Sequence, residues 1–293
     1  MFQYAFMRNA FLAGTALSIV SGLVGYFVIL RRQAFAGEAL SDVAFTGAVG
    51  GVVLGINPLA GMIVLTLLGA LAMGSFALRI GERDIAVGTV LAWVLGLGVL
   101  SLTLLTNHVS GSSGFSGVTV LFGSILSISS QQTLLIVIIA VAVGLALLAV
   151  ARPLLFASLD PDVASARGVP VRFLGLVFMA LLAVTVAEAV QAVGALLVFA
   201  LLLLPAAIAQ RLIARPYIAL GLAVVFAVLS TWLGLMLGFY SGLPSGVCIS
   251  LLAFAGYVGV VGYRSIRQRV TGSRSHRMPD SLLERTHLHD QIK

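Results

Sequence analysis

Long apolar runs separated by short polar segments fill most of the chain. Each run has roughly the 20 residues that an α-helix needs to cross the hydrocarbon core of a bilayer. The pattern therefore predicts an all-α, polytopic membrane protein with eight or nine transmembrane helices. The runs cover residues 9–30, 36–57, 59–79, 85–106, 131–151, 173–190, 192–210, 217–240 and 245–263. A further apolar stretch, residues 115–130, is short, and we interpret it either as a span or as a re-entrant or interfacial segment.

The basic residues occupy every second connection between these runs. The basic connections hold Arg31 and Arg32, then Arg79 and Arg83, then Arg152, Arg167 and Arg172, then Arg211 and Arg215, and a basic tail starts at Arg264. The connections around Pro58, His108 and Pro244 contain neither Lys nor Arg. Basic connections stay in the cytoplasm, so we expect an outer N-terminus and a cytoplasmic C-terminus. Residues 1–263 then form the transmembrane domain, and residues 264–293 form a polar cytoplasmic tail.

The composition excludes several classes of protein. Of the 293 residues, 60% are hydrophobic and 9% are charged, whereas a soluble domain has about 25% charged residues. This excludes a soluble globular protein and a disordered one. The single cysteine, Cys248, excludes an internal disulfide and a cysteine-based metal cluster within one chain. The single lysine, Lys293, is the last residue, so the chain has no phosphate-binding P-loop and does not hydrolyse ATP by that machinery.

Small residues recur at intervals of four in three of the runs. The three sets are Gly14, Ser18 and Gly22; Gly47, Gly51 and Gly55; and Gly234, Gly238 and Gly242. In lipid, this spacing lets helix backbones approach closely. We expect helix packing within one bundle, and a dimer contact is the alternative for one of the sets.

Two carboxylates lie in the second run, where a charge is expensive. Glu38 and Asp42 are four residues apart, so one helix face presents both, with Ser41 beside them. Two such groups do not both ionise in a low dielectric unless a cation lies between them. A hard divalent cation satisfies both carboxylates, and protonation in a proton-coupled carrier is the competing solution. A third alternative pairs Glu38 with Arg31 or Arg32 near the cytoplasmic interface.

Three other places offer weaker candidates for a transport pathway or a metal site. Glu188 lies near an outer turn, where it either lines the mouth of a pathway or stays solvated at the interface. His108 lies in an outer connection and is a possible metal contact. In the tail, His287 and His289 have a spacing that can bind metal, and a solvated tail is the alternative.

Several sequence blocks occur together in a specific order. They read LRR at 30–32, GEALSD at 37–42, LFGSIL at 121–126, LDPDVA at 159–164, GVP at 168–170, QAVGALLV at 191–198, LPAAIA at 204–209 and LPSG at 243–246. In this order and spacing the chain resembles the membrane-spanning permease of bacterial manganese, zinc and iron ABC importers, the ABC-3 family. The likeness runs from about Phe11 to Gly262.

The resemblance implies a type II ABC importer permease fold, related to the cobalamin and siderophore permeases. It implies a second permease copy, most simply as a homodimer, two cytoplasmic ATPase subunits and an extracytoplasmic metal-binding protein. ATP hydrolysis then belongs to the ATPase, so this chain is not itself an enzyme and binds no permanent cofactor. The expected place is the bacterial plasma (inner) membrane, and the expected cargo is manganese or zinc, with iron as a further option.

In this family the second span typically reads Gly-Asp-Ala-Leu-Ser-His, and the acid and the histidine form the gate and metal position. Glu38 and Asp42 hold those places here, and Thr46 replaces a proline that usually follows. The loss of imidazole removes the ligand that zinc favours, so an all-oxygen pair favours manganese or iron.

The resemblance also points to two elements that couple the permease to the ATPase. The turn from Pro205 to Pro216, with Gln210 and Arg211, resembles a coupling element, and an ordinary basic connection is its alternative. The segment 160–170, which includes Asp162, is the second candidate. There Asp160 can cap a short helix that Pro161 begins and Gly168 ends.

We therefore expect the membrane-spanning permease of an ATP-driven importer for divalent metal ions that works by alternating access. Two other functions stay open at this point: a type II permease for a siderophore or cobalamin, and a proton-coupled secondary carrier that uses Glu38 and Asp42 as proton sites.

Overall fold

The structure, a computed structural model, describes residues 4–80, 83–108, 123 and 125–275. Within these ranges all regular structure is helical, in ten α-helices and one 3₁₀ helix. The elements are α1 (Ala5–Leu30), α2 (Ala34–Val53), α3 (Pro58–Ile80), α4 (Arg83–His108), η1 (Ile125–Ser127), α6 (Ser130–Leu159), α7 (Pro161–Ala166), α8 (Val171–Val193), α9 (Ala195–Leu212), α10 (Pro216–Ser241) and α11 (Ser245–Ser275).

Each of the nine predicted apolar runs is confirmed as a helix. Seven of these helices are long and apolar enough to cross a membrane by themselves. The other two are α2, which carries two acids and several glycines, and α9, which is a shorter apolar helix. The stretch 115–130 falls mostly outside the described residues, and its described end contains η1 and the start of α6.

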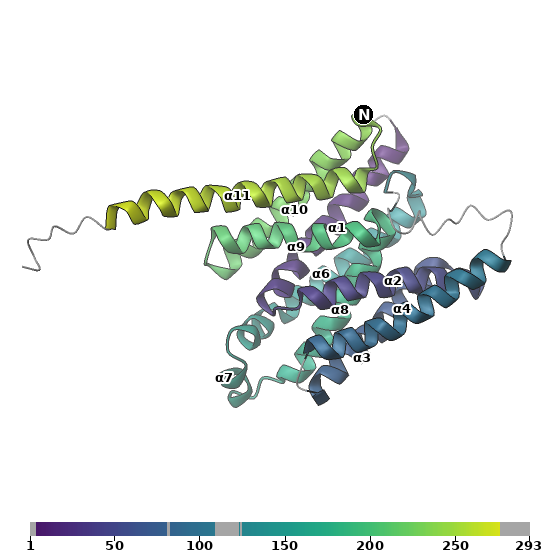
Figure 1. Ribbon diagram of the computed structural model, residues 1–293, viewed down its shortest axis with the longest axis horizontal. Coiled ribbons are helices and arrows are strands. Elements are labelled where there is room, and N and C mark those ends of the chain that lie inside the picture. Colours follow the sequence, from purple (N-terminus) through teal and green to yellow (C-terminus); the bar gives the residue numbers. More distant parts are fainter. Residues whose placement is uncertain (1–3, 81–82, 109–122, 124, 276–293) are drawn as a thin grey trace, which may run out of the picture.

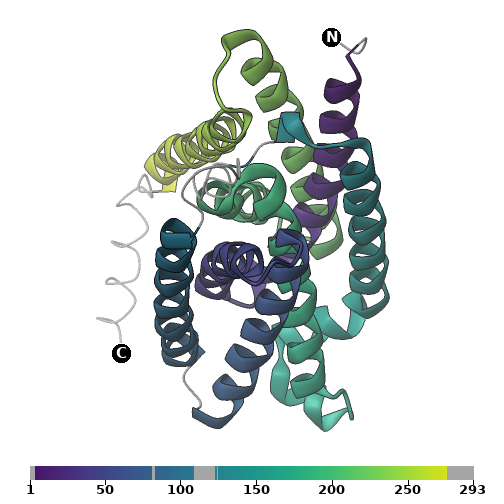
Figure 2. The ribbon, with the colours of Figure 1, turned by 90° about the vertical axis from the view of Figure 1, so that its right-hand side faces the viewer.

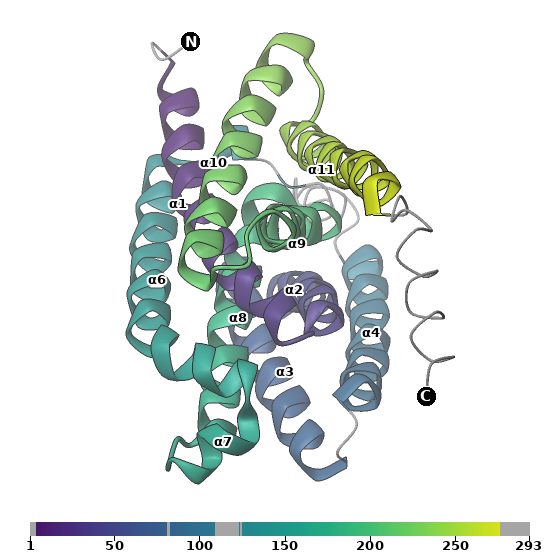
Figure 3. The ribbon, with the colours of Figure 1, turned by 90° about the vertical axis from the view of Figure 1, so that its left-hand side faces the viewer.

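Two of the seven membrane-spanning helices are mostly buried in the bundle. In α1, 72% of the apolar window is buried, and in α8 61%, against 28% in α3, α4 and α6. The poorly buried helices therefore provide the surface that meets lipid. The ribbon shows α2 and α9 side by side, with α3 and α4 on one side of α2 and α10 and α11 beyond α9 (Figures 1 and 3). The view from the other side shows the same order (Figure 2).

The small-residue sets are confirmed as packing sites between helices. A Cβ atom on Gly61 of α3 would overlap the backbone carbonyl of Gly47 on α2. Likewise, a Cβ atom on Gly22 would lie 2.8 Å from the Cα of Val224 on α10. Backbones therefore touch at these crossings, which is how helices attract each other in lipid.

The last glycine of two sets has a different role, because Gly55 and Gly242 have φ values of +70° and +69°. A left-handed residue of this kind ends a helix, and glycine adopts it without steric cost.

The short helix α7 begins and ends as the sequence predicts. Asp160 is its N-cap, and the Oδ1 atom of that residue accepts a hydrogen bond of 3.0 Å from the backbone N–H of Val163. Pro161 occupies the first turn, and Gly168, with φ +80°, follows the end of the helix. In Figure 1, α7 lies apart from the long helices at one end of the bundle. It is thus a small exposed element at a fixed position.

Candidate functional site

The two acids of α2 lie on a face of the helix that no other described helix covers fully. Glu38 is exposed, and Asp42 and Phe45, four and seven residues further, are half-buried. These residues recur with the period of an α-helix and so form one stripe. We call this stripe the open face of α2.

Contacts on the other sides of α2 fix the direction in which the open face points. A Cβ atom on Gly37 would meet Leu202 of α9 at 3.3 Å, and Thr46 contacts Gly98 of α4. The side of α2 that carries Gly47 lies against α3. The open face is therefore opposite α3 and lies between the sides that contact α9 and α4.

The open face concentrates negative charge. The carboxylates of Glu38 and Asp42 are close enough for mutual electrostatic repulsion. Ser41 is buried, and the hydroxyl of its side chain donates a 2.7 Å hydrogen bond to the backbone carbonyl of Glu38. Ser41 thus contributes to the local helix structure beside the acids. Arg31 reaches toward α8, where its guanidinium carbon lies 5.5 Å from the centre of the Phe178 ring.

A cation at the open face needs ligands beyond those two side chains. Among the described residues, no three His, Cys, Asp or Glu side chains form a group that could hold a metal ion. Two carboxylates can nevertheless attract a hard divalent cation, whose remaining ligands are then water or groups from another chain. A pair of this kind binds weakly enough to release its ion, which suits a pathway better than a storage site.

Glu188 lies in a sealed environment in α8. Its side chain is 0% exposed, and neither carboxylate oxygen has a hydrogen-bond partner among the residues that the structure describes. The Oε1 atom of Gln191, one turn further, is also buried without a partner. Thr185 donates its hydroxyl hydrogen bond to the backbone carbonyl of Leu181 and so does not reach the carboxylate.

The residues proposed to contact an ATPase differ in accessibility. Asp160 and Asp162 are exposed at the start of α7. Pro205 is buried inside α9. Gln210 donates a 2.8 Å hydrogen bond from Nε2 to the backbone carbonyl of Tyr26. Arg211 lies with its guanidinium carbon 5.0 Å from the centre of the Tyr257 ring.

Two other candidates cannot be placed by their side chains. His108 is the last residue of α4, and its side chain lies outside the described residues. The histidines of the tail, at 276, 287 and 289, lie outside them as well.

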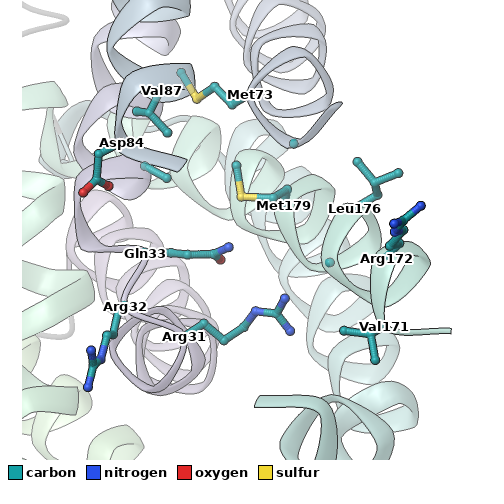
Figure 4. A pocket seen from close by; sticks show the side chains of 13 residues that line it. Arg31, Arg32, Gln33, Met73, Asp84, Val87, Val171, Arg172, Leu176 and Met179 are labelled. Carbon is teal, nitrogen blue, oxygen red and sulfur yellow. The ribbon is translucent and has the colours of Figure 1, made fainter. Parts of the chain in front are cut away.

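The structure also contains a basic cavity of about 280 Å³ that sequence reasoning missed. Its walls include Arg31 and Arg32 from the turn between α1 and α2, Asp84 from α4 and Arg172 from α8 (Figure 4). From the sequence, these arginines mark the membrane topology, and Arg31 or Arg32 is a possible partner of Glu38. They come from segments far apart in the chain, so no local pattern signals that they share a cavity.

Comparison with known proteins agrees with this architecture. The profile of the ABC 3 transport family matches residues 3–263. The chain is 32% identical over 250 residues to the manganese import system permease protein ScaB of Streptococcus parasanguinis, covering 85% of this chain and 87% of that protein. It is 31% identical over 247 residues to the high-affinity zinc uptake system membrane protein ZnuB of Haemophilus influenzae, covering 84% and 92%.

A solved structure is similar over the same region. PsaBC from Streptococcus pneumoniae, determined in complex with Fab, superposes with a TM-score of 0.76 at 29% identity, covering 88% of this chain and 91% of that one.

Proposed function

The chain belongs to the ABC 3 transport family, and on that basis we propose that it is the permease subunit of an ATP-driven importer of divalent metal ions. Its helices make it a multi-pass protein of the plasma membrane. The observation that carries the choice of cargo is the open face of α2, where Glu38 and Asp42 stand on a side of the helix that the other described helices do not cover fully. The names of ScaB and ZnuB, which refer to manganese import and zinc uptake, support the same cargo.

The open face also supports a position for a second permease copy. A charged, half-open helix side is costly in lipid, so we place a second copy of the chain against it. Cyclic dimers are the most frequent symmetric assembly. In such a dimer the acids of both copies line one central pathway, and the number of oxygen ligands around a passing ion doubles.

The orientation and the other partners follow from the charge pattern. The pattern of basic connections supports an N-terminus outside and a C-terminus in the cytoplasm. The cytoplasmic ATPase subunits then dock at α7, whose exposed Asp160 and Asp162 lie at the same end of the bundle as the basic connections. An extracytoplasmic metal-binding protein delivers the ion to the opposite end.

Within this assembly the acid pair acts as a transient ion contact. ATP binding closes the two ATPase subunits and tilts the helices about the central pathway, so the open face is exposed to each side in turn. The negative charge lowers the electrostatic barrier that a divalent cation meets in the membrane. Oxygen ligands without imidazole favour manganese or iron over zinc at this point.

The test is metal-resolved uptake into proteoliposomes that contain the permease, its ATPase and its binding protein. We expect ATP-dependent accumulation of manganese, with zinc and iron as competitors. The double variant Glu38→Gln, Asp42→Asn keeps the side-chain size and removes both charges. We expect it to lower the uptake rate at least tenfold, the lower end of the effect that loss of metal-supporting groups typically has.

Two measurements keep this test decisive. The double variant has to assemble with the ATPase as the parent chain does, which size-exclusion chromatography of the complex checks. Unchanged metal uptake by an assembled double variant contradicts the role of the acids. Uptake that a proton gradient drives in the absence of ATP contradicts the importer itself and supports a proton-coupled carrier.

A further inference from the structure

The basic cavity lies where several helices begin or end. It is lined by the turn between α1 and α2, the first turn of α2, the second half of α3, the first turns of α4 and the first three turns of α8. We call it the arginine pocket and define it by Arg31, Arg32, Asp84 and Arg172, together with the apolar side chains described below. At about 280 Å³, it has room for a small chemical group such as a lipid headgroup.

The electrostatics of the arginine pocket favour an anion. Among the residues whose side chains the structure describes, the lining includes three arginines, Arg31, Arg32 and Arg172, and one carboxylate, that of Asp84. The stacking of Arg31 on the Phe178 ring holds that side chain in place. Arg172 stands in the first turn of α8, whose N-cap, Pro170, provides no side-chain hydrogen bond. The positive end of this helix therefore adds to the charge of the arginines.

The other part of the wall is apolar. Met73, Val87, Leu176 and Met179 line the cavity as well. In Figure 4, Met73 and Val87 lie together at the top, and the apolar Leu176 lies beside Arg172. A ligand that satisfies both parts of the wall carries a negative charge next to a hydrocarbon segment.

The level of the pocket matches the boundary between membrane and water. Phe76 is 44% exposed near the end of α3, and Phe173 is 64% exposed at the start of α8. Exposed aromatic side chains at helix ends are typical of this boundary. With the orientation proposed above, this boundary is the cytoplasmic one, where basic pockets between helices bind anionic lipid headgroups.

We propose that the arginine pocket binds the headgroup of an anionic phospholipid, with the phosphate between Arg31 and Arg172 and the first carbons of the lipid against Leu176. An acidic side chain of an ATPase subunit would neutralise the arginines but would leave Leu176, the half-buried apolar side chain of this wall, without a cover. Met73 and Met179 are already buried and form the back of the pocket. The inference rests on the orientation in the proposed function and is independent of the identity of the transported metal.

The experiment measures lipid retention by the purified complex of permease and ATPase. The complex is incubated in mild detergent with equal amounts of phosphatidylglycerol and phosphatidylcholine, and native mass spectrometry counts the lipids that stay bound. We expect preferential retention of phosphatidylglycerol by the parent chain. Arg172→Gln should reduce that retention about fivefold, the effect of one basic residue near an anionic headgroup.

Two further variants test whether the effect depends on the position of the arginine and on the net charge of the pocket. Arg215 is exposed at the N-cap of α10, outside the pocket, so Arg215→Gln should leave the retention unchanged. Asp84→Asn removes the opposing carboxylate and should increase the retention. All variants have to elute from size-exclusion chromatography as complexes of the parent size. A loss of bound lipid is then not caused by unfolding or by loss of the ATPase.

Three outcomes would overturn the proposal. Equal losses in Arg172→Gln and Arg215→Gln would show a general effect of surface charge. Displacement of the lipid by an excess of inorganic phosphate would identify a free anion as the ligand. Retention by the permease alone that disappears when the ATPase is added would assign the pocket to an acidic ATPase side chain. None of these readouts involves metal, so a failed uptake experiment leaves them interpretable.

Discussion

Glu38 and Asp42 on α2 and Glu188 on α8 are carboxylates within one bundle of membrane helices, but their surroundings are opposite. The α2 acids lie on an open face, one exposed and one half-buried. Glu188 is fully enclosed, and within the described part of the chain neither of its oxygens has a hydrogen-bond partner. The comparison shows that a carboxylate in a membrane helix is not by itself a sign of a pathway. Access decides whether a passing ion can exchange ligands with it.

The α2 acids and Glu188 also differ in the contacts that surround them. The α2 acids are held by a helix whose other sides touch α3, α4 and α9. The packing of the backbone of α2 against these helices therefore fixes the direction in which the two acidic side chains point. Glu188 sits among apolar residues of the core, where an unpaired polar group costs free energy. The open acids are thus suited to transient binding, and the closed one makes no contact that would require its charge.

The largest expected effect comes from removing the packing that directs the open face. In Gly47→Val, the new side chain would run into the backbone of Gly61 on α3, because a Cβ atom on Gly47 would already lie 2.6 Å from the Gly61 carbonyl oxygen. We expect a loss of about 3 kcal/mol of stability, at the upper end for overpacking, and a complete loss of uptake. The thermal unfolding midpoint of the purified chain measures the first effect.

The same helix offers a matched control. A Cβ atom on Gly50 would meet its nearest neighbour, the hydroxyl of Ser101, at an ordinary 3.7 Å. Gly50→Ala should therefore keep the unfolding midpoint, or raise it through the better helix propensity of alanine. If Gly47→Val and Gly50→Ala unfold at the same temperature, close packing does not direct the open face.

A smaller effect is expected from changing the chemistry of the open face without removing it. Asp42→His places an imidazole, a preferred zinc ligand, beside Glu38. We expect the ratio of zinc to manganese uptake to rise severalfold, measured with both metals present. Asp42→Glu keeps an oxygen ligand and should leave the ratio as it is. An unchanged ratio in both variants would show that the binding protein alone sets metal selectivity.

The pattern of apolar runs was sufficient to predict the helices, because burial in lipid requires long apolar segments wherever a chain crosses the membrane. Capping chemistry likewise located α7, since Asp160, Pro161 and Gly168 act within a few residues of one another. Both patterns are local, so neither predicts which helices contact each other in the bundle. The spacing of Glu38 and Asp42 placed both acids on one face, but it could not show that α3 covers the opposite side.

Long-range placement explains what the sequence could not predict. Glu188 lies on a helix that is apolar all round, so periodicity gave no direction for its side chain. The arginine pocket joins residues from separate helices, and each arginine alone is indistinguishable from a topology marker. Sites made by contacts between distant segments need the packing of the helices, which depends on the glycines at each crossing.

The smallest effect is expected at the sealed acid, and it is the sharpest test of the comparison. Glu188→Gln keeps the shape of the side chain and removes any negative charge. Because the carboxylate has no partner to lose, we expect metal uptake within about twofold of the parent chain, and an unchanged or higher unfolding midpoint, since an uncharged group is less costly to bury. Uptake by proteoliposomes and thermal unfolding are measured on the same preparation. A tenfold loss of uptake with an unchanged midpoint would mean that α8 opens during the transport cycle and that Glu188 meets the ion in another conformation. Accessibility in one conformation would then be too narrow a criterion for separating the two kinds of acid.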